Sequence, residues 1–118
     1  PWVRVPGSFA TPLPDGLTAL EAAAIGVAGH TVALAIDLME LNGLAPGSGP
    51  VAVTGATGGT GSLAVSMLAG LGHAVTALSR KPDDGFLRRL GAAEVIPVPD
   101  GRRKPLESAR FAGGIDTT

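Results

Sequence analysis

The chain contains no cysteine and no tyrosine, and aromatic residues make up only 3% of its 118 positions. Without cysteine, neither a disulfide framework nor a thiolate metal site can form. So few aromatic side chains also exclude the base-stacking platforms of proteins that bind single-stranded nucleic acid. At this length the chain is one domain or part of one, with enough residues to bury a sizeable core.

The chain also lacks an excess of charge of either sign, because 9 basic and 10 acidic residues give a formal net charge of −1. This balance provides no electrostatic attraction to nucleic acid or to an anionic membrane. The basic cluster Arg102–Lys104 is offset by Asp100 and Glu107, and we interpret it as a solvated loop.

Long apolar runs are missing as well, since glycines interrupt the longest of them and leave each one too short to span a bilayer. No basic segment followed by an apolar one comes after Pro1, as a secretory signal would require. We therefore expect a cytoplasmic protein with neither a membrane nor a nucleic-acid partner.

What the chain does contain is a strand-turn-helix unit that begins at Val51. A short β-branched run leads into a glycine-rich turn, and the turn opens into an apolar helix. The unpaired N–H groups and the dipole at the start of such a helix favour an anion, and together with the glycines they form a cradle for a dinucleotide pyrophosphate. The predicted pyrophosphate-binding residues are Gly55, Ala56, Thr57, Gly58, Gly59, Thr60 and Gly61.

The glycines of this turn match the dinucleotide fingerprint in the form Ala56-x-Gly58-x-x-Gly61, with Gly55 available for the tight turn. Gly58 would let the backbone approach the pyrophosphate, and Gly61 would let the helix pack closely on the strand. The alternative is a glycine-rich turn that binds no ligand. No G-K-[ST] sequence follows the glycines, which excludes a P-loop for nucleoside triphosphates.

Strands alternate with helices from residue 51 onward, and this order predicts an α/β fold with a Rossmann-like parallel sheet. The pattern is the βαβαβ half of a nucleotide-binding domain, and it ends as a further strand opens. The second strand is apolar almost throughout, which predicts burial on both faces. The expected strands are 51–54, 74–78, 94–98 and 114–118, and the expected helices are 59–71 and a short one from Asp83 or Asp84 to Leu90, with Gly91 as its C-terminal cap.

A helical lead-in precedes this unit. Thr18 and Glu21 have the spacing of a capping box, and an apolar helical run follows them. Gly26 and Gly29 are expected to split the run into a short helix and a longer one that starts near His30. We therefore divide the chain into a proline-rich extended connecting segment, 1–17, and a partial dinucleotide-binding domain, 18–118.

The residues after the second strand, Ser79, Arg80 and Lys81, predict which nicotinamide cofactor binds. Sites for NAD usually carry an acidic residue there to bind the ribose 2′-hydroxyl. An arginine fork, a serine hydroxyl and a lysine suit a 2′-phosphate instead, so the sequence favours NADPH. The alternative is an ordinary solvated basic turn.

Two histidines remain, and neither predicts a metal site. His30 and His73 lie far apart in the sequence, and no cysteine accompanies them. We expect His30 to belong to a helix start and His73 to be a surface or capping residue at a corner between helix and strand.

Three segments resemble the medium-chain dehydrogenase/reductase superfamily in its zinc-independent quinone oxidoreductase branch: Leu20–Thr31, Val53–Ser62 and Leu90–Ile96. Zinc-dependent members of the superfamily place a cysteine ligand near Val27. Ser79-Arg80 and Gly113–Thr117 most resemble the acryloyl-CoA reductases, which use NADPH to saturate a short α,β-unsaturated thioester.

The resemblance implies that the chain is a cofactor-domain fragment of a longer reductase, because members of the superfamily carry a separate substrate domain. The parent protein would transfer hydride from NADPH to an activated C=C bond of an enoyl thioester or a quinone, and it would form a homo-oligomer. Thr31 would lie near the nicotinamide ribose, and no catalytic residue is expected in this chain. Thr60 departs from the family, which often has valine in the loop.

Two alternatives remain open. The loop also fits the short-chain and NmrA-like reductases, although these place it near the N-terminus and usually carry a Tyr-x-x-x-Lys pair, whereas this chain has a long lead-in and no tyrosine. A non-catalytic NADPH-sensing module is the second alternative.

Overall fold

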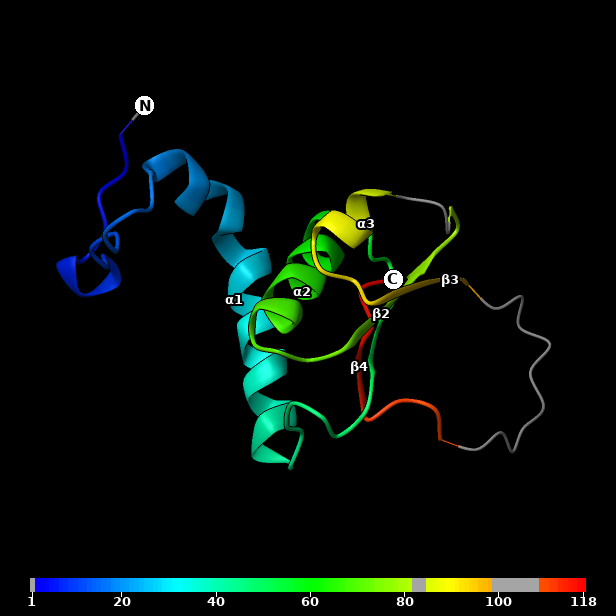
Figure 1. Cartoon of the computed structure of the whole chain (residues 1–118). Helices are drawn as coiled ribbons and strands as arrows, with labels where there is room; N and C mark the ends of the chain where they lie inside the picture. Colours follow the sequence, from blue (N-terminus) through cyan, green and yellow to red (C-terminus); the bar gives the residue numbers. More distant parts are fainter. Residues whose placement is uncertain (1, 82–84, 99–108) are drawn as a thin grey trace.

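A parallel four-stranded sheet forms the centre of the protein (Figure 1), and the computed structural model describes residues 2–81, 85–98 and 109–118. The strands lie in the order β3-β2-β1-β4, and every neighbouring pair is parallel. The predicted Rossmann-like α/β fold is therefore confirmed. The elements are η1 (Gly7–Phe9), α1 (Ala19–Leu41), β1 (Val51–Val53), α2 (Gly59–Gly70), β2 (Val75–Ser79), α3 (Gly85–Arg89), β3 (Glu94–Pro97) and β4 (Gly113–Ile115).

The strand order places β1 in the interior of the sheet. The chain moves outward from β1 through β2 to β3, and β4 then pairs with the free side of β1. In the register, Val53 at the end of β1 lies between Ala77 of β2 and Ile115 of β4. The connections leave β1 toward opposite sides, so the carboxyl ends of β1 and β4 flank the switch point at which doubly wound sheets bind ligands.

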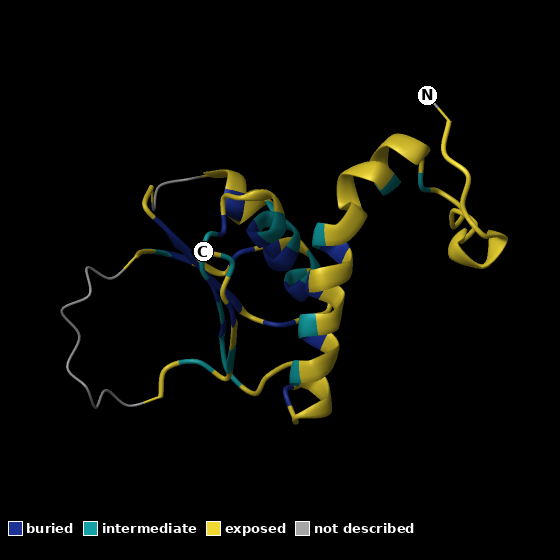
Figure 2. Cartoon of the chain, turned by 180° about the vertical axis from the view of Figure 1, so that it is seen from behind, coloured by how far each residue is buried: buried dark blue, intermediate teal, exposed yellow. Residues whose placement is uncertain are grey.

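The helices α1 and α2 pack side by side against one face of the sheet (Figure 1). Figure 2 shows the buried residues gathered where these helices meet the strands. As predicted, every residue of β2 is buried. The fully or nearly fully buried side chains of this core include Val32, Ile36, Val51, Val53, Val65, Leu68, Val75, Ala77 and Leu87.

Helix α1 begins with the predicted capping box. The Thr18 backbone N–H donates to Glu21 Oε2 at 2.9 Å, and the Glu21 backbone N–H donates to Thr18 Oγ1 at 3.3 Å. The Thr18 hydroxyl also donates to Glu21 Oε2, at 2.7 Å, and this bond, followed by the one from the Thr18 backbone N–H, holds the pKa of the Glu21 carboxyl below its usual value. The reciprocal pair satisfies two backbone groups that a helix start otherwise leaves unpaired.

A kink at Gly26 divides α1, and there the sequence expectation needs correction. Gly26 has φ 39° and ψ −139°, a conformation that favours glycine. The second segment follows this residue directly and does not start near His30, because Gly29 keeps helical geometry and packs against Ile25. The second segment ends at Leu41, before the positive-φ Gly43.

The expectation that every apolar run is too short for a membrane is wrong for α1. By length and composition this helix could cross a bilayer. Its second half nevertheless takes part in the core, because Val32 and Ile36 are buried between α1 and the rest of the domain.

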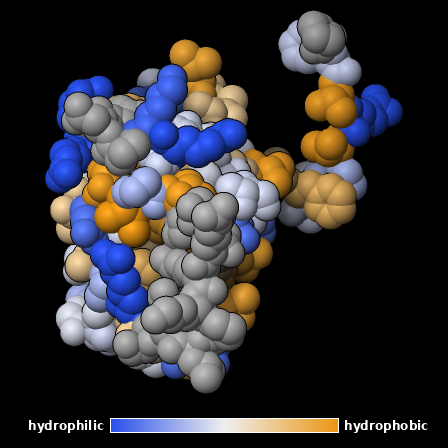
Figure 3. All heavy atoms as spheres, turned by 90° about the vertical axis from the view of Figure 1, so that its right-hand side faces the viewer, coloured by the Kyte–Doolittle hydropathy of each residue, from blue (hydrophilic) through white to orange (hydrophobic). Residues whose placement is uncertain are grey.

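In the connecting segment before α1, none of the described residues, 2–17, has a buried side chain. The segment contains the short helix η1, and the side chains of Trp2, Val3 and Phe9 are exposed. Figure 3 shows this segment standing away from the main body of the molecule.

Helix α3 ends as predicted, with Gly91 at φ 103° and the Ala92 N–H donating to the Leu87 carbonyl at 3.0 Å. The predicted N-cap residues Asp83 and Asp84 lie outside the described residues, as does the segment that holds Arg102–Lys104, Asp100 and Glu107.

Helix α2 packs closely on the turn that follows β1 at Gly61. A Cβ added there would overlap the carbonyl oxygen of Gly55 and lie 2.8 Å from the Cα of Ala56. A Cβ on Gly59 would meet no heavy atom within 4 Å. These two glycines therefore form a matched pair, one packed against backbone and one open.

We predict that Gly61→Ala lowers the free energy of unfolding by about 1–3 kcal/mol, because α2 must move away from the loop. Gly59→Ala should change it by less than about 1 kcal/mol, since alanine suits a helix and nothing obstructs it. Urea unfolding followed by circular dichroism measures both. Equal effects of the two substitutions would contradict the close packing at Gly61.

Candidate functional site

The turn between β1 and α2 has the shape that a phosphate-binding loop requires. Gly55 has φ 56°, and its carbonyl accepts a hydrogen bond of 2.9 Å from the Gly58 N–H, which closes the turn. Ala56 is buried beneath the turn, whereas Thr57 and Gly58 are exposed. The turn therefore points its backbone outward over the carboxyl end of β1.

The start of α2 presents unpaired amides next to this turn. Gly58 is the N-cap and provides no side-chain hydrogen bond, and the first turn contains no acidic residue. The Ser62 N–H makes the first intrahelical bond, to the Gly58 carbonyl at 2.8 Å, so the amides of Gly59, Thr60 and Gly61 precede the helical ladder. This end of the helix can accept an anion without displacing a capping side chain.

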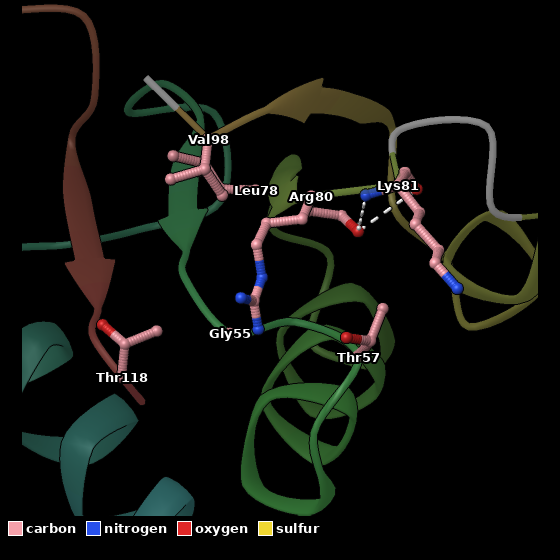
Figure 4. Close-up of a pocket in the computed structure, with 8 residues that line it drawn as sticks. Gly55, Thr57, Leu78, Arg80, Lys81, Val98 and Thr118 are labelled. Carbon is pink, nitrogen blue, oxygen red and sulfur yellow. Dashed lines mark hydrogen bonds between the residues drawn. The ribbon is translucent and has the colours of Figure 1, made fainter. Parts of the chain in front are cut away.

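A cleft of about 730 Å³ opens beside the loop (Figure 4). Residues at the ends of β1, β2, β3 and β4 line it, so it lies along the carboxyl edge of the sheet. Its lining residues are Gly55, Thr57, Leu78, Ser79, Arg80, Lys81, Val98 and Thr118.

Five of the predicted binding residues therefore lie in the cleft wall, namely Gly55, Thr57, Ser79, Arg80 and Lys81. The predicted residues Ala56 and Gly58–Gly61 belong to the adjoining turn and helix start. Thr31 is on α1, outside the lining set, and its hydroxyl donates to the Val27 carbonyl at 2.9 Å.

The basic residues after β2 differ in what they contact. Figure 4 shows Arg80 extending toward the phosphate loop, while Lys81 points to the other side. Both are exposed, and neither side chain makes a hydrogen bond or ion pair within the part of the chain that the structure describes. Ser79 is buried, and its hydroxyl accepts from the Lys81 N–H at 3.0 Å and contacts the Lys81 carbonyl at 3.2 Å. Ser79 thus shapes the turn that displays the two cations.

A second polar cluster at this edge was not found by sequence reasoning. The carboxylate of Asp116, just after β4, accepts hydrogen bonds from the hydroxyls of Thr54 and Thr118 and from the Thr118 backbone N–H. These bonds hold the pKa of the Asp116 carboxyl below its usual value. The bonds from the Thr54 and Thr118 side chains contribute most, followed by the one from the Thr118 backbone. The signal that could have found it is positional, since Thr54 and Asp116 each follow a strand and parallel strands end at one edge.

The histidines take no part in the cleft, and the expectation for His73 is wrong. His73 is 5% exposed, and its Nε2 lies 3.1 Å from Glu40 Oε1. It joins the end of α1 to the start of β2, which the sequence could not show because 33 residues separate the partners. Among the described residues, no three His, Asp or Glu side chains gather as a metal site requires.

The fold and the site together define one half of a dinucleotide-binding Rossmann domain. The criteria are the strand order β3-β2-β1-β4, a glycine turn after β1 and uncapped amides at the start of α2. Residues that fit a dinucleotide are therefore present at the carboxyl edge of the sheet.

Comparison with known proteins identifies the family. The chain is 42% identical over 117 residues to the acrylyl-CoA reductase AcuI of Ruegeria pomeroyi, covering 96% of this chain and 36% of that protein. It is 45% identical over 120 residues to the putative quinone oxidoreductase YhfP of Bacillus subtilis, covering 98% and 36%. No protein-family model matches the chain.

Comparison with solved structures finds similarity to the same group of oxidoreductases. The yhdH oxidoreductase of Salmonella enterica in complex with NADP superposes with a TM-score of 0.82 at 42% identity, covering 91% of this chain and 34% of that one. Bacillus subtilis yhfP with NAD bound gives 0.77 at 45% identity, covering 88% and 33%.

The chain belongs to the medium-chain dehydrogenase/reductase family, and its relatives include proteins named as acrylyl-CoA reductases and quinone oxidoreductases. This membership sets the short-chain and NmrA-like alternative aside. The chain spans about a third of the length of these relatives, 36% of each.

The lowered pKa of Asp116 predicts a pH dependence of stability. Its folded pKa lies below the unfolded value, so its carboxylate stabilises the fold above the ordinary aspartate pKa, about 3.9. That contribution is lost as the pH falls through the folded pKa. The difference in melting temperature between the unmodified protein and Asp116→Asn should therefore be constant at neutral pH and shrink in acid.

Calorimetric melting from neutral pH to strong acid measures this difference. Asp37→Asn is the control, because Asp37 is exposed on α1 and makes no hydrogen bond with the described residues. A difference for Asp116→Asn that stays unchanged in acid would contradict the prediction.

Proposed function

We propose that the chain is the NADPH-binding part of a reductase and that the cleft at the carboxyl edge holds the cofactor. One observation carries the choice of NADPH: Arg80, at the end of β2, is exposed in the cleft wall without a partner among the described residues. An NAD site would hold an acidic residue at this position. The crystallisation of the Salmonella enterica relative with NADP supports the proposal.

Each predicted residue receives a role in this proposal. The backbone of Gly55–Gly61 binds the pyrophosphate, with the amides of Gly59, Thr60 and Gly61 at the positive end of α2. Arg80 grips the 2′-phosphate through its planar fork, and Lys81 adds a charge nearby. Ser79 holds their turn in place, and Thr31 stays a prediction for the nicotinamide ribose.

The reaction proposed for a protein that contains this chain is reduction of an activated C=C bond, in an enoyl thioester such as acryloyl-CoA or in a quinone. The support is the similarity to AcuI and YhfP, whose names give these two substrate classes. The nicotinamide supplies hydride, while this chain binds and orients the cofactor. We assign no catalytic residue to the chain.

The remaining parts of the proposal concern organisation. We assign 18–118 to a partial dinucleotide-binding domain and 1–17 to a connecting segment. We also propose a cytoplasmic homo-oligomer that acts on a small molecule.

The cofactor assignment predicts that calorimetric titration finds tighter binding of NADPH than of NADH. Arg80→Ala should weaken NADPH binding about 10- to 100-fold and leave NADH binding nearly unchanged, since only NADPH has the 2′-phosphate. Arg110→Ala is the control, because Arg110 is an exposed arginine that pairs with Glu94 outside the cleft. Equal affinity for both cofactors, unaffected by Arg80→Ala, would refute the assignment.

The reductase proposal predicts that the 118-residue chain alone does not oxidise NADPH in the presence of acryloyl-CoA. A protein that contains this chain together with the remaining length of its relatives should do so, because the match covers only 36% of the Ruegeria pomeroyi relative and leaves the rest of its length outside. Loss of NADPH absorbance measures both. Tight NADPH binding without turnover on enoyl thioesters and quinones would instead favour the non-catalytic sensing module.

A further inference from the structure

Asp116 makes contacts that the proposed cofactor site does not yet explain. Its Oδ1 accepts from the Thr118 N–H at 3.1 Å, from the Thr118 hydroxyl at 2.8 Å and from the Thr54 hydroxyl. Thr118 lines the cleft, and Thr54 is the residue directly before Gly55. One carboxylate oxygen therefore connects the β4 side of the cleft to the entry of the phosphate loop.

Thr54 is held through all its polar atoms by the end of β4. Its N–H donates to the Ile115 carbonyl at 3.1 Å, and its carbonyl accepts from the Thr117 hydroxyl at 2.8 Å. Its hydroxyl accepts from the Thr117 N–H at 3.1 Å and donates to Asp116. The orientation of the hydroxyl is thus set by one donor and one acceptor on a segment about sixty residues away.

The loop depends on this residue. Gly55 turns at φ 56°, and a Cβ there would overlap the Thr117 hydroxyl. The Gly55 carbonyl then accepts from Gly58 at 2.9 Å, and Gly61 packs on the same carbonyl. A rotation of Thr54 would change the Gly55 turn and, through it, the direction of the amides at the start of α2.

We propose that Asp116 is a positioning residue for the phosphate loop: it fixes Thr54, and through Thr54 it sets the Gly55–Gly61 backbone that holds the pyrophosphate. This inference rests on the proposed function. In this proposal Asp116 does not contact the cofactor. It positions the loop that binds the pyrophosphate, which NADPH and NADH share. Its loss therefore weakens both cofactors alike, unlike the loss of Arg80.

The test combines titration of both cofactors with hydrogen exchange in the unliganded protein. Asp116→Ala should weaken NADPH and NADH about tenfold each, leaving their ratio unchanged, because hydrogen bonds to a charged acceptor are lost. Asp116→Asn keeps an oxygen acceptor, so its affinity for each cofactor should lie between those of the unmodified protein and Asp116→Ala. Thr54→Val should match Asp116→Ala, the double variant should add little to either, and Thr54→Ser should restore affinity.

Hydrogen exchange gives a readout without ligand. Asp116→Ala should speed exchange at the Gly58 amide, which donates to Gly55, and leave the Gly72 amide, which donates to Ala69 in another turn, unchanged. Unchanged Gly58 exchange or unchanged cofactor affinity in Asp116→Ala overturns the inference, as does additivity in the double variant. If the unmodified protein binds neither cofactor, the proposed function itself is wrong, and this result distinguishes that failure from a failure of the inference about Asp116.

Discussion

The carboxyl end of β1 is the point on which the other parts of the structure depend. β1 is paired on both sides, and the chain that follows it must turn at Gly55 toward α2 while β4 ends beside it. Backbone packs on backbone there, since Gly61 rests on the Gly55 carbonyl. This contact tolerates only glycine, and it brings the start of α2 to the edge of the sheet. The orientation of the uncapped amides follows from it.

The sequence predicted the features that depend on neighbouring residues, namely the strands, the glycine turn and the helix caps. Repeated β-branched runs, the glycine turn and the capping residues gave the strands to within a few residues, and the apolar second strand was buried as expected. The glycine turn between β1 and α2 could be predicted because its strand, turn and helix are adjacent in the chain. Arg80 and Lys81 reach the cleft for a similar reason, as they directly follow β2.

The contacts that could not be predicted join distant segments. His73 meets Glu40, and Thr54 meets Asp116, through packing that no local pattern encodes. Their positions follow from strand order, and strand order becomes known only with the structure. The kink at Gly26 is a different case, because the sequence offered two glycines and only the backbone geometry distinguishes them.

Overall similarity does not decide which cofactor the cleft prefers. Identity is 42% to a structure with NADP and 45% to one with NAD, a difference too small to separate the two. In the proposed site the distinction comes from the residues that follow β2. Arg80 and Lys81 both have exposed side chains there that are unpaired among the described residues, and of the two Arg80 extends toward the loop after β1 (Figure 4). In the same proposed site, the loop and its support from β4 hold the pyrophosphate, which both cofactors share. The proposal thus assigns anchoring to the end of β1 and selection to the end of β2, so a substitution of Arg80 can change the preference between the two cofactors without changing the turn after β1.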